Sequence, residues 1–232
     1  MTGLVRRATI LCAGGLIVAG AAMAGIPSAT TSTIPTCITL SDAQSNAACN
    51  FMVIRDANNN PVAGSSITLD FSACTVGDVS ICNVQNNQAA TIGGASTQPA
   101  AATCGSHTVT VGCDALGQIC LMLNGGSNLA NGHGPASGNR PTCCTIYADS
   151  KIMGTVPVTV CRFDLASPQN NTINSGDLSA WLNYAGGAFG AYRDYADYNC
   201  SGTVNSGDLS QWLTCAGLGL NTSQVGCTTF CP

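Results

Sequence analysis

The sequence contains no glutamate and a single lysine, and charged residues are scarce throughout. They make up 8% of the 232 residues, against about 25% in an ordinary soluble domain. The eleven acidic residues are all aspartate, and the basic residues are six arginines and Lys151. A nucleic-acid-binding protein needs a basic face that neutralises phosphates, so this class is disfavoured. Because Glu and Lys are the usual surface residues of helices, a protein built of long helices is disfavoured as well.

A catalytic site also lacks support. No glutamate is present to pair with an aspartate as acid and base, and no phosphate-binding or dinucleotide motif appears. His107 and His133 lie beside or near glycines in loop-like stretches without a nucleophile motif. We therefore expect no enzymatic activity. A secreted hydrolase whose site is assembled only in space is the remote alternative.

What is present favours strands and turns. Asparagine, serine, threonine and glycine supply the polarity, and hydrophobic residues, at 45%, suffice for a core of ordinary size. Six short apolar or alternating runs lie between Cys49 and Arg162, separated by turn-forming clusters: 51–54, 66–71, 107–111, 119–123, 145–148 and 155–160. This spacing predicts a two-sheet β-sandwich or a barrel.

The first 24 residues have the pattern of a secretory signal peptide. Arg6 and Arg7 precede an apolar run from residue 8 to about 21, and residues 22–24 offer a small-x-small cleavage site. The run is short and glycine-rich for a membrane anchor, which needs about 20 residues. Cleavage after Ala24 leaves five basic and eleven acidic residues, a net charge of −6. We expect a secreted protein with no stable membrane span after cleavage.

Cysteine usage agrees with export to an oxidising environment. Fourteen cysteines follow the leader, at positions 37, 49, 74, 82, 104, 113, 120, 143, 144, 161, 200, 215, 227 and 231. An even number in an exported protein is typical of a disulfide framework. A metal site is the alternative, but no pair of CxxC units is present and only two histidines are available. The sequence leaves the pairing open.

The strongest internal signal is a repeat near the C-terminus. Residues 172–182, TINSGDLSAWL, return 31 positions later as residues 203–213, TVNSGDLSQWL, with nine of eleven positions identical. An Ala-Gly pair follows each copy, at 185–186 and 216–217. The pattern predicts a duplicated supersecondary unit.

The second copy, read from Asp197, matches a calcium-binding loop. Oxygen-bearing residues occupy positions 1, 3, 5, 7, 9 and 12, and glycine occupies position 6: Asp197, Asn199, Ser201, Thr203, Asn205, Asp208 and Gly202. Calcium takes six to eight oxygen ligands, and position 7 contributes its backbone carbonyl. Leu209, Trp212, Leu213 and Ala216 then recur at the spacing of an amphipathic helix. An ordinary Asn/Ser/Gly turn before a helix is the alternative.

The first copy is altered. Counting back from Asp177 at position 12 places Asn174 at 9, Thr172 at 7 and Asn170 at 5. Positions 3 and 1 would then be Pro168 and Ala166, which offer no side-chain oxygen. Asp164 lies two residues upstream of position 1, so it can serve only if the loop is two residues longer. We expect one calcium ion at the second loop and a retained but altered site at the first.

The two loop–helix units resemble a type I dockerin module over residues 163–219. The resemblance rests on the paired loops, on aspartate at position 12 and on the absence of an entering helix before the first loop. It implies folding on calcium binding and attachment to a cohesin partner through loop positions 10 and 11. Those positions are Ser175-Gly176 and Ser206-Gly207, where the family carries a pair of hydroxyl residues. Glycine there indicates a different partner or a module that stays docked on its own chain.

A second resemblance covers residues 49–162. Residues 56–64, DANNNPVAG, and 113–118, CDALGQ, resemble strand-turn signatures of bacterial Ig-like domains such as those of invasin-type adhesins. Residues 25–48 precede this region as an extended segment. Its part 25–35 could pair with a sheet edge of a neighbouring molecule, or it could be a flexible linker. Residues 220–232 form a Cys-containing tail after the dockerin-like module. The predicted fold class is mainly β: a disulfide-rich Ig-like β-sandwich followed by a small α-helical dockerin-like module with two EF-hand-type calcium loops.

These features favour a non-catalytic, calcium-binding structural or adhesive protein of a bacterium that assembles through protein–protein contacts outside the cell. A subunit of a surface or extracellular fibre fits this description, and we favour self-association over a cohesin-like scaffold. The alternative is an Ig-like cargo module that its dockerin attaches to a cohesin-bearing scaffold. Both hypotheses require a protein partner and no nucleic acid, and they differ in whether the partner is another copy of the chain.

Overall fold

The computed structural model describes residues 25–41, 49–77, 79–81, 88–90, 97–99, 101–127, 142–161, 163–166, 173–185 and 196–217. Within these ranges the chain is mainly β, with eleven strands, two 3-10 helices and two short α-helices. Several predicted features lie outside the described residues: the leader 1–24, the tail 220–232, His133, Asn170 and Thr172.

The strands occupy the chain between residues 38 and 161. They are β1 Ile38–Ser41, β2 Asn50–Val53, β3 Ser66–Asp70, β4 Val79–Ile81, β5 Gln88–Ala90, β6 Thr97–Pro99, β7 Ala101–Thr103, β8 Thr108–Gly112, β9 Gln118–Ser127, β10 Thr142–Ala148 and β11 Lys151–Cys161. Two 3-10 helices, η1 Ser72–Gly77 and η2 Cys104–Ser106, interrupt them. All six runs that the sequence assigned to strands overlap these elements, so the pattern of short apolar and alternating runs located six of the strands correctly.

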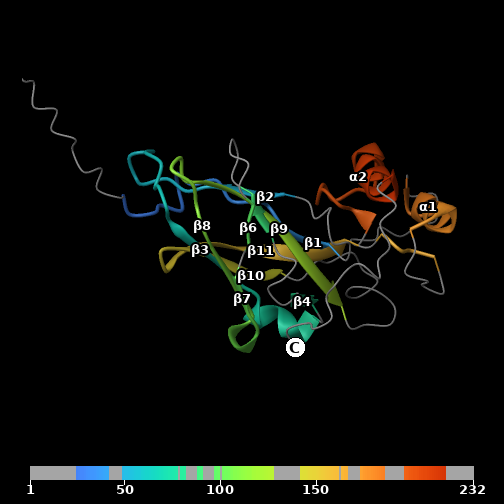
Figure 1. Ribbon diagram of the computed structural model, residues 1–232, viewed down its shortest axis with the longest axis horizontal. Helices are drawn as coiled ribbons and strands as arrows, with labels where there is room; N and C mark the ends of the chain where they lie inside the picture. The colour runs from blue at the N-terminus through green and yellow to red at the C-terminus, as the bar shows by residue number, and fades with distance from the viewer. Residues whose placement is uncertain are drawn as a thin grey trace, which may run out of the picture.

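The strands pair along one continuous path, a sheet that curls around the core (Figure 1). The order is β6-β5-β9-β1-β11-β10-β3-β8-β7, and β2 and β4 also pair with β9. β1 lies between β11 and β9 and is parallel to both, with Ile38 opposite Val158 and Leu40 opposite Leu123. The sequence interpretation left residues 25–48 outside the sandwich. In the structure, residues 38–41 of this segment form strand β1 within the sheet. The sequence did not reveal this strand because all four of its residues are buried, so they show no alternation of buried and exposed positions.

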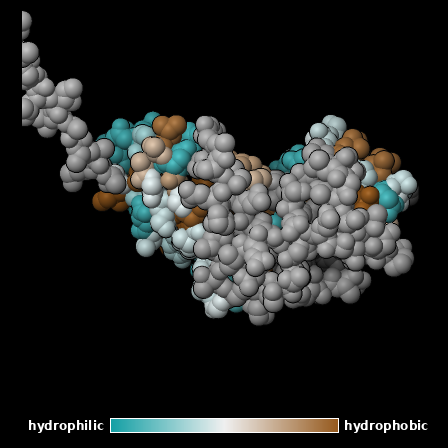
Figure 2. All heavy atoms as spheres, in the orientation of Figure 1, coloured by the Kyte–Doolittle hydropathy of each residue, from teal (hydrophilic) through white to brown (hydrophobic). Residues whose placement is uncertain are grey.

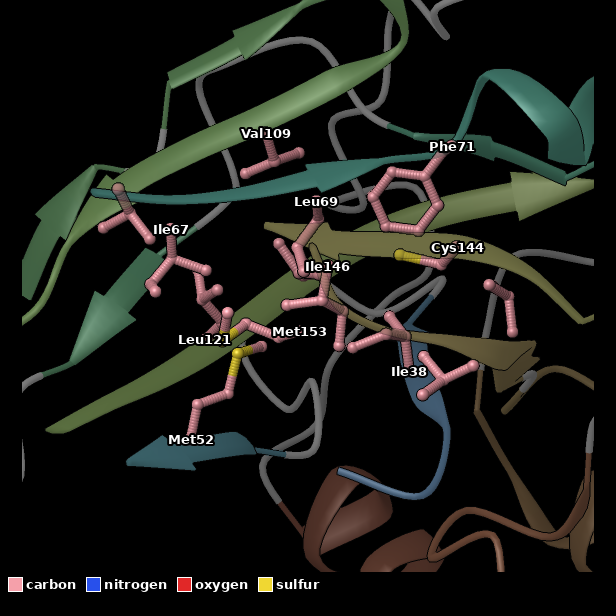
Figure 3. Packing of buried hydrophobic residues seen from close by; sticks show 14 of the residues in the cluster. Ile38, Met52, Ile67, Leu69, Phe71, Val109, Leu121, Cys144, Ile146 and Met153 are labelled. Atoms are coloured by element: carbon pink, nitrogen blue, oxygen red, sulfur yellow. The ribbon is translucent and has the colours of Figure 1, made fainter. Parts of the chain in front are cut away.

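The core is filled by aliphatic side chains from opposite parts of this path (Figure 3). Ile67 and Leu69 of β3, Ile146 of β10 and Leu121 of β9 belong to one cluster, and each is fully buried. Burial of one such side chain contributes about 1.5–3 kcal/mol. The polar residues between Ile67 and Leu69 and after Leu69 are only partly buried, which is the alternation expected of a strand with one buried face.

Two turns organise the end of the sheet remote from the helices. Asp56 Oδ1 accepts the backbone N–H of Asn60 (2.9 Å), and Asp114 Oδ1 accepts that of Gln118 (2.8 Å). The hydrogen bonds from Asn60, its backbone N–H first, lower the pKa of the exposed Asp56 carboxyl. Gly117 closes the second turn with φ +68°, a conformation that favours glycine. The two stretches that the sequence singled out are therefore tight turns built on an aspartate cap.

Residues 25–35 pair with their own chain. Thr33 and Val53 exchange two backbone hydrogen bonds of 2.8 and 2.9 Å, and Ser28 N donates to Arg55 O at 2.8 Å. Isolated bridges join Pro27 to Asp56 and Thr33 to Val53. This segment is therefore neither a free linker nor a strand kept for a neighbour, because the end of β2 supplies the partner for its backbone.

Three disulfides cross-link the described residues: Cys37–Cys200, Cys49–Cys120 and Cys74–Cys143. They indicate an oxidising compartment. The predicted framework does not include every cysteine, since Cys113 and Cys144 are buried thiols. Burial, followed by the charge of Asp114, raises the pKa of Cys113 to about 12, and burial also raises that of Cys144. Both are apolar core residues, and Cys144 packs among the side chains of Figure 3.

The two α-helices, α1 Ser175–Leu182 and α2 Ser206–Gly217, lie together at one end of the molecule (Figure 1). Each begins at position 10 of a predicted calcium loop, so that the position 12 aspartate lies in its first turn. No helix among the described residues is long and apolar enough to cross a membrane.

Candidate metal centre

The second predicted calcium loop, 197–208, holds two buried carboxylates at its ends. Asp197 and Asp208 both have 0% exposed surface. The oxygens of Asp197 accept the backbone N–H groups of Ser201 (3.0 Å) and Gly202 (2.8 Å). Those of Asp208 accept Asn199 N (3.2 Å) and Asn205 N (2.8 Å). The backbone of the loop thus wraps around both acidic side chains.

Between these carboxylates lie the neutral oxygens of the loop. Ser201 Oγ donates to the Thr203 carbonyl oxygen at 3.0 Å. The Asn205 side-chain amide donates to Ser201 Oγ (3.3 Å), Thr203 O (3.3 Å) and Thr203 Oγ1 (3.0 Å). This amide N–H therefore faces the same oxygens that the sequence assigned to a cation.

The electrostatics of the carboxylate pair fit a cation. Burial, the largest cause, and the charge of Asp197 raise the pKa of Asp208, while backbone N–H groups of Asn205, Asn199 and Tyr198 act in the opposite sense. Two buried aspartates of like charge favour a divalent cation beside them, because the cation offsets their mutual repulsion. The donor set consists of carboxylate, amide, hydroxyl and carbonyl oxygens, which suits calcium better than a softer metal.

Clusters of three or more His, Cys, Asp or Glu side chains that could hold a metal do not occur in the described ranges. The second loop contains two carboxylates, and its remaining candidate ligands are neutral oxygens. Ligand charge tunes calcium affinity, so a calcium ion at a loop of this composition would be held at the weak end of the range.

The first loop is held by its own backbone. Asp177 is fully buried, and its Oδ1 accepts the N–H groups of Leu165 and Ala166, each at 2.8 Å. Its Oδ2 accepts Asn174 N at 2.8 Å. Asp164 is also buried, at 3% exposed surface, and lies in the same loop. Residues 167–172, where the predicted two-residue insertion falls, lie outside the described residues, so the altered site stays a prediction.

The loop ends also serve as helix caps. Asn174 caps α1 by accepting Gly176 N at 2.7 Å, and Asp177 completes a capping box. In the second loop, Asn205 Oδ1 accepts Gly207 N at 2.8 Å. Because this oxygen is occupied, Asn205 suits the water-mediated contact that position 9 often makes with calcium.

The two loops and helices share a small core of their own. It contains Trp181, Tyr198, Val204 and Trp212, all buried, together with Ile173. Val204 and Ile173, which occupy position 8 of the second and first loops, pack in this one cluster. Leu213 was predicted to lie on the apolar face of this helix, but it is 49% exposed, because the adjacent Trp212 occupies the buried position.

Phe163 connects this small core to the strands. It follows β11 by two residues, and its ring stacks on that of Tyr198 with centroids 4.7 Å apart. The Trp212 indole N–H donates to the Phe163 carbonyl oxygen at 3.2 Å. The end of β11 is thus held against the second loop and its helix.

Sequence reasoning missed the role of Cys200, which lies at position 4 of the second loop. It is bonded to Cys37, directly before β1, with Cα atoms 6.4 Å apart. A cysteine within a calcium loop was the available signal, but the sequence does not reveal its partner, which lies 163 residues away.

The four predicted partner-binding residues, Ser175, Gly176, Ser206 and Gly207, are exposed at the helix starts. A Cβ atom added at Gly176 would lie 3.0 Å from Asn174 Oδ1, and one added at Gly207 would lie 2.9 Å from Asn199 Nδ2. The glycines therefore leave room for the asparagine side chains of the loops. A larger residue at position 11 would have to displace these side chains.

Two exposed leucines lie on the same helices. Leu182 and Leu213 occupy equivalent positions in the repeat and are 52% and 49% exposed. Figure 2 shows hydrophobic side chains at the end of the molecule where α1 and α2 lie.

His107 lies directly before β8 with φ +53°, and its carbonyl oxygen accepts the backbone N–H of Phe71 at 2.9 Å.

Comparisons with known proteins place the chain in no family: no family model matches it, and no curated protein matches it. Among solved structures, it is similar to the Yersinia pseudotuberculosis adhesin InvE, with a TM-score of 0.27 and 17% sequence identity. The similarity covers 60% of this chain and 28% of the adhesin chain, so the chain spans little more than a quarter of that protein. At this TM-score the functional argument rests on the chain's own residues.

Proposed function

We propose that this chain is a secreted, non-catalytic, calcium-binding structural or adhesive protein that assembles through protein–protein contacts outside the cell. Its strands form an Ig-like sandwich, and residues 163–219 form a dockerin-like module that binds one calcium ion at the second loop. The observation that carries the proposal is the pair of fully buried carboxylates, Asp197 and Asp208, with neutral oxygens between them.

Calcium binding at this loop orders the surface that meets a partner. Ser206 and Gly207 follow the position 9 residue, Asn205, directly, and Asp208 lies in the first turn of α2. An ion held by Asp197 and Asp208 therefore fixes the start of α2 and, through the shared core, the exposed leucines of both helices. Leu182 and Leu213, each about half exposed, are the apolar side chains that a protein partner would cover.

Self-association is favoured over capture by a cohesin-like scaffold. Loop position 11 is glycine in both copies, and the space beside each glycine is taken by asparagine side chains. The cargo hypothesis keeps some support, because Ser175 and Ser206 at position 10 are both exposed.

The experiment is light scattering on leader-free, oxidised protein, in millimolar calcium and then in excess chelator, with calcium binding measured by calorimetry on the same sample. We expect calcium binding and assemblies that shrink when the ion is removed. A monomer in both conditions that still binds calcium would favour the cargo hypothesis. Absence of calcium binding at the second loop would refute the proposal.

A further inference from the structure

The Cys37–Cys200 disulfide joins the second calcium loop to the middle of the sheet. Cys37 is buried and directly precedes β1, whose residues are all buried between β9 and β11. Cys200 lies in the loop between Asn199 and Ser201, which the sequence assigned as ligand positions 3 and 5. One end of the bond is therefore anchored in the core, and the other lies within the candidate metal site.

Cys200 lies between two of the backbone N–H groups that hold the carboxylates. On one side, Asn199 N donates to Asp208 Oδ1 at 3.2 Å. On the other side, Ser201 N donates to Asp197 Oδ1 at 3.0 Å. A displacement of Cys200 moves both donors, and with them both acidic ends of the loop.

The backbone at Cys200 also needs external support. Its φ is +58°, in the left-handed region, which costs about 1–2 kcal/mol for a residue other than glycine. Its N–H lies 3.5 Å from the Asp197 carbonyl oxygen, at the long limit of a hydrogen bond. The disulfide supplies a covalent restraint at the one loop residue that combines this backbone with a weak hydrogen bond.

A second attachment gives the restraint a fixed direction. The chain leaves β11 at Cys161 and reaches Phe163, which contacts Tyr198 of the second loop and Trp212 of α2. In the sheet, Cys161 lies opposite Ser41, the last residue of β1, whereas Cys37 lies before its first. The two attachments thus start from opposite ends of β1, positions about 13 Å apart along the strand at 3.3 Å per residue. Two separated attachments restrain both the position and the orientation of the loop.

We infer that Cys200, through its disulfide to Cys37, is a positioning residue for the calcium loop, so that calcium binding and oxidation of this one bond stabilise each other. The inference rests on the proposed calcium site and adds a covalent determinant of its affinity. Reduction transfers two electrons and two protons from a dithiol, which leaves as a cyclic disulfide, and converts the bond into the thiols of Cys37 and Cys200. Because linkage is reciprocal, a loop that binds calcium better when oxidised makes the bond harder to reduce when calcium is present.

The test compares two disulfide-free variants. Cys37→Ser/Cys200→Ser removes the bond at the loop, and Cys74→Ser/Cys143→Ser removes a bond between η1 and β10. Groups that orient metal ligands typically change metal affinity by about 10–100-fold. We expect a loss of at least about 10-fold in calcium affinity, measured by calorimetry, for the first variant and less than about 3-fold for the second. Both should melt below the wild-type protein in chelator.

A second measurement uses the unmodified protein, and so remains decisive if the first variant does not fold. The protein is exposed to dithiothreitol with calcium or with chelator, free thiols are alkylated at intervals, and each bond is followed by peptide mass spectrometry. Calcium should protect Cys37–Cys200 selectively over Cys49–Cys120 and Cys74–Cys143. A 10-fold preference of calcium for the oxidised loop corresponds to a reduction potential about 30 mV lower with calcium bound.

The outcomes separate the two proposals. Calcium affinity that is equal in the wild-type protein and in Cys37→Ser/Cys200→Ser would overturn the positioning role and leave the calcium site standing. Equal protection of all three bonds, or of none, would also overturn it. If the wild-type protein itself binds no calcium, the proposed function fails first and the inference fails with it.

Discussion

Replacement of both acidic ends of the second loop, Asp197→Asn/Asp208→Asn, should abolish the stabilisation that calcium gives this protein. Each carboxylate accepts two backbone N–H groups in addition to its proposed role as a calcium ligand. An asparagine side chain has one acceptor oxygen, so each replacement leaves one buried N–H without its partner, at a cost of about 1–3 kcal/mol. The variant should therefore melt below the wild-type protein even in chelator.

The calcium-dependent increment is the informative quantity, because it excludes that basal cost. Extracellular calcium modules bind with dissociation constants of about 10⁻⁴–10⁻³ M, and a loop with two carboxylates belongs to this range. At about 10 mM calcium, the ion then stabilises the folded protein by about 1.4–2.7 kcal/mol. For a chain of this size, this corresponds to a rise in Tm of about 3–11 °C.

The assay is thermal unfolding of oxidised protein followed by circular dichroism, in calcium and in chelator. The wild-type protein should show this rise, and the double variant should show none. Asp177→Asn is the matched control, since Asp177 also accepts several backbone N–H groups at the end of a loop. It should lower the basal Tm yet keep the second-loop increment. A double variant that retains the full increment would refute calcium binding through Asp197 and Asp208.

Two further predictions concern the thiols and the helix surface. Cys113 has a folded pKa of about 12, above the value of 9.0 for an unperturbed thiol, so the folded state keeps a proton that the unfolded state loses. The free energy of unfolding that this group contributes is present below pH 9 and is lost as pH rises from about 9 to 12. Cys113→Ala should therefore lose less stability over this pH range than the wild-type protein, as measured by denaturant unfolding curves at a series of pH values. A pH profile of stability equal to that of the wild-type protein would contradict the raised pKa of Cys113. Leu182→Asp/Leu213→Asp should weaken calcium-dependent assembly in light scattering without changing calcium affinity, because both side chains are about half exposed; assembly at the wild-type level would exclude this surface.

The local pattern of residues determined much of this protein. The alternation in 66–70 predicted β3, and the repeated TxNSGDLSxWL motif located both loops and both helices, because turns, caps and amphipathic faces depend on neighbours within a few residues. The oxygen spacing from Asp197 to Asp208 predicted a calcium loop, since alternate residues of a tight loop present their oxygens to one side; the ligand set stays a prediction. β1 was missed because a short strand buried on both faces has no distinctive period.

Tertiary structure decided the contacts between distant residues. Only the folded sheet places β1 between β9 and β11 and pairs residues 25–35 with the edge of β2. Folding also selects Cys37 as the partner of Cys200 and leaves Cys113 and Cys144 as buried thiols, because disulfide pairing depends on which cysteines the chain brings within bonding distance. The sequence thus determined the chemistry of the candidate calcium loop, and the packing of the sheet decided that this loop is covalently held by the residue that precedes β1.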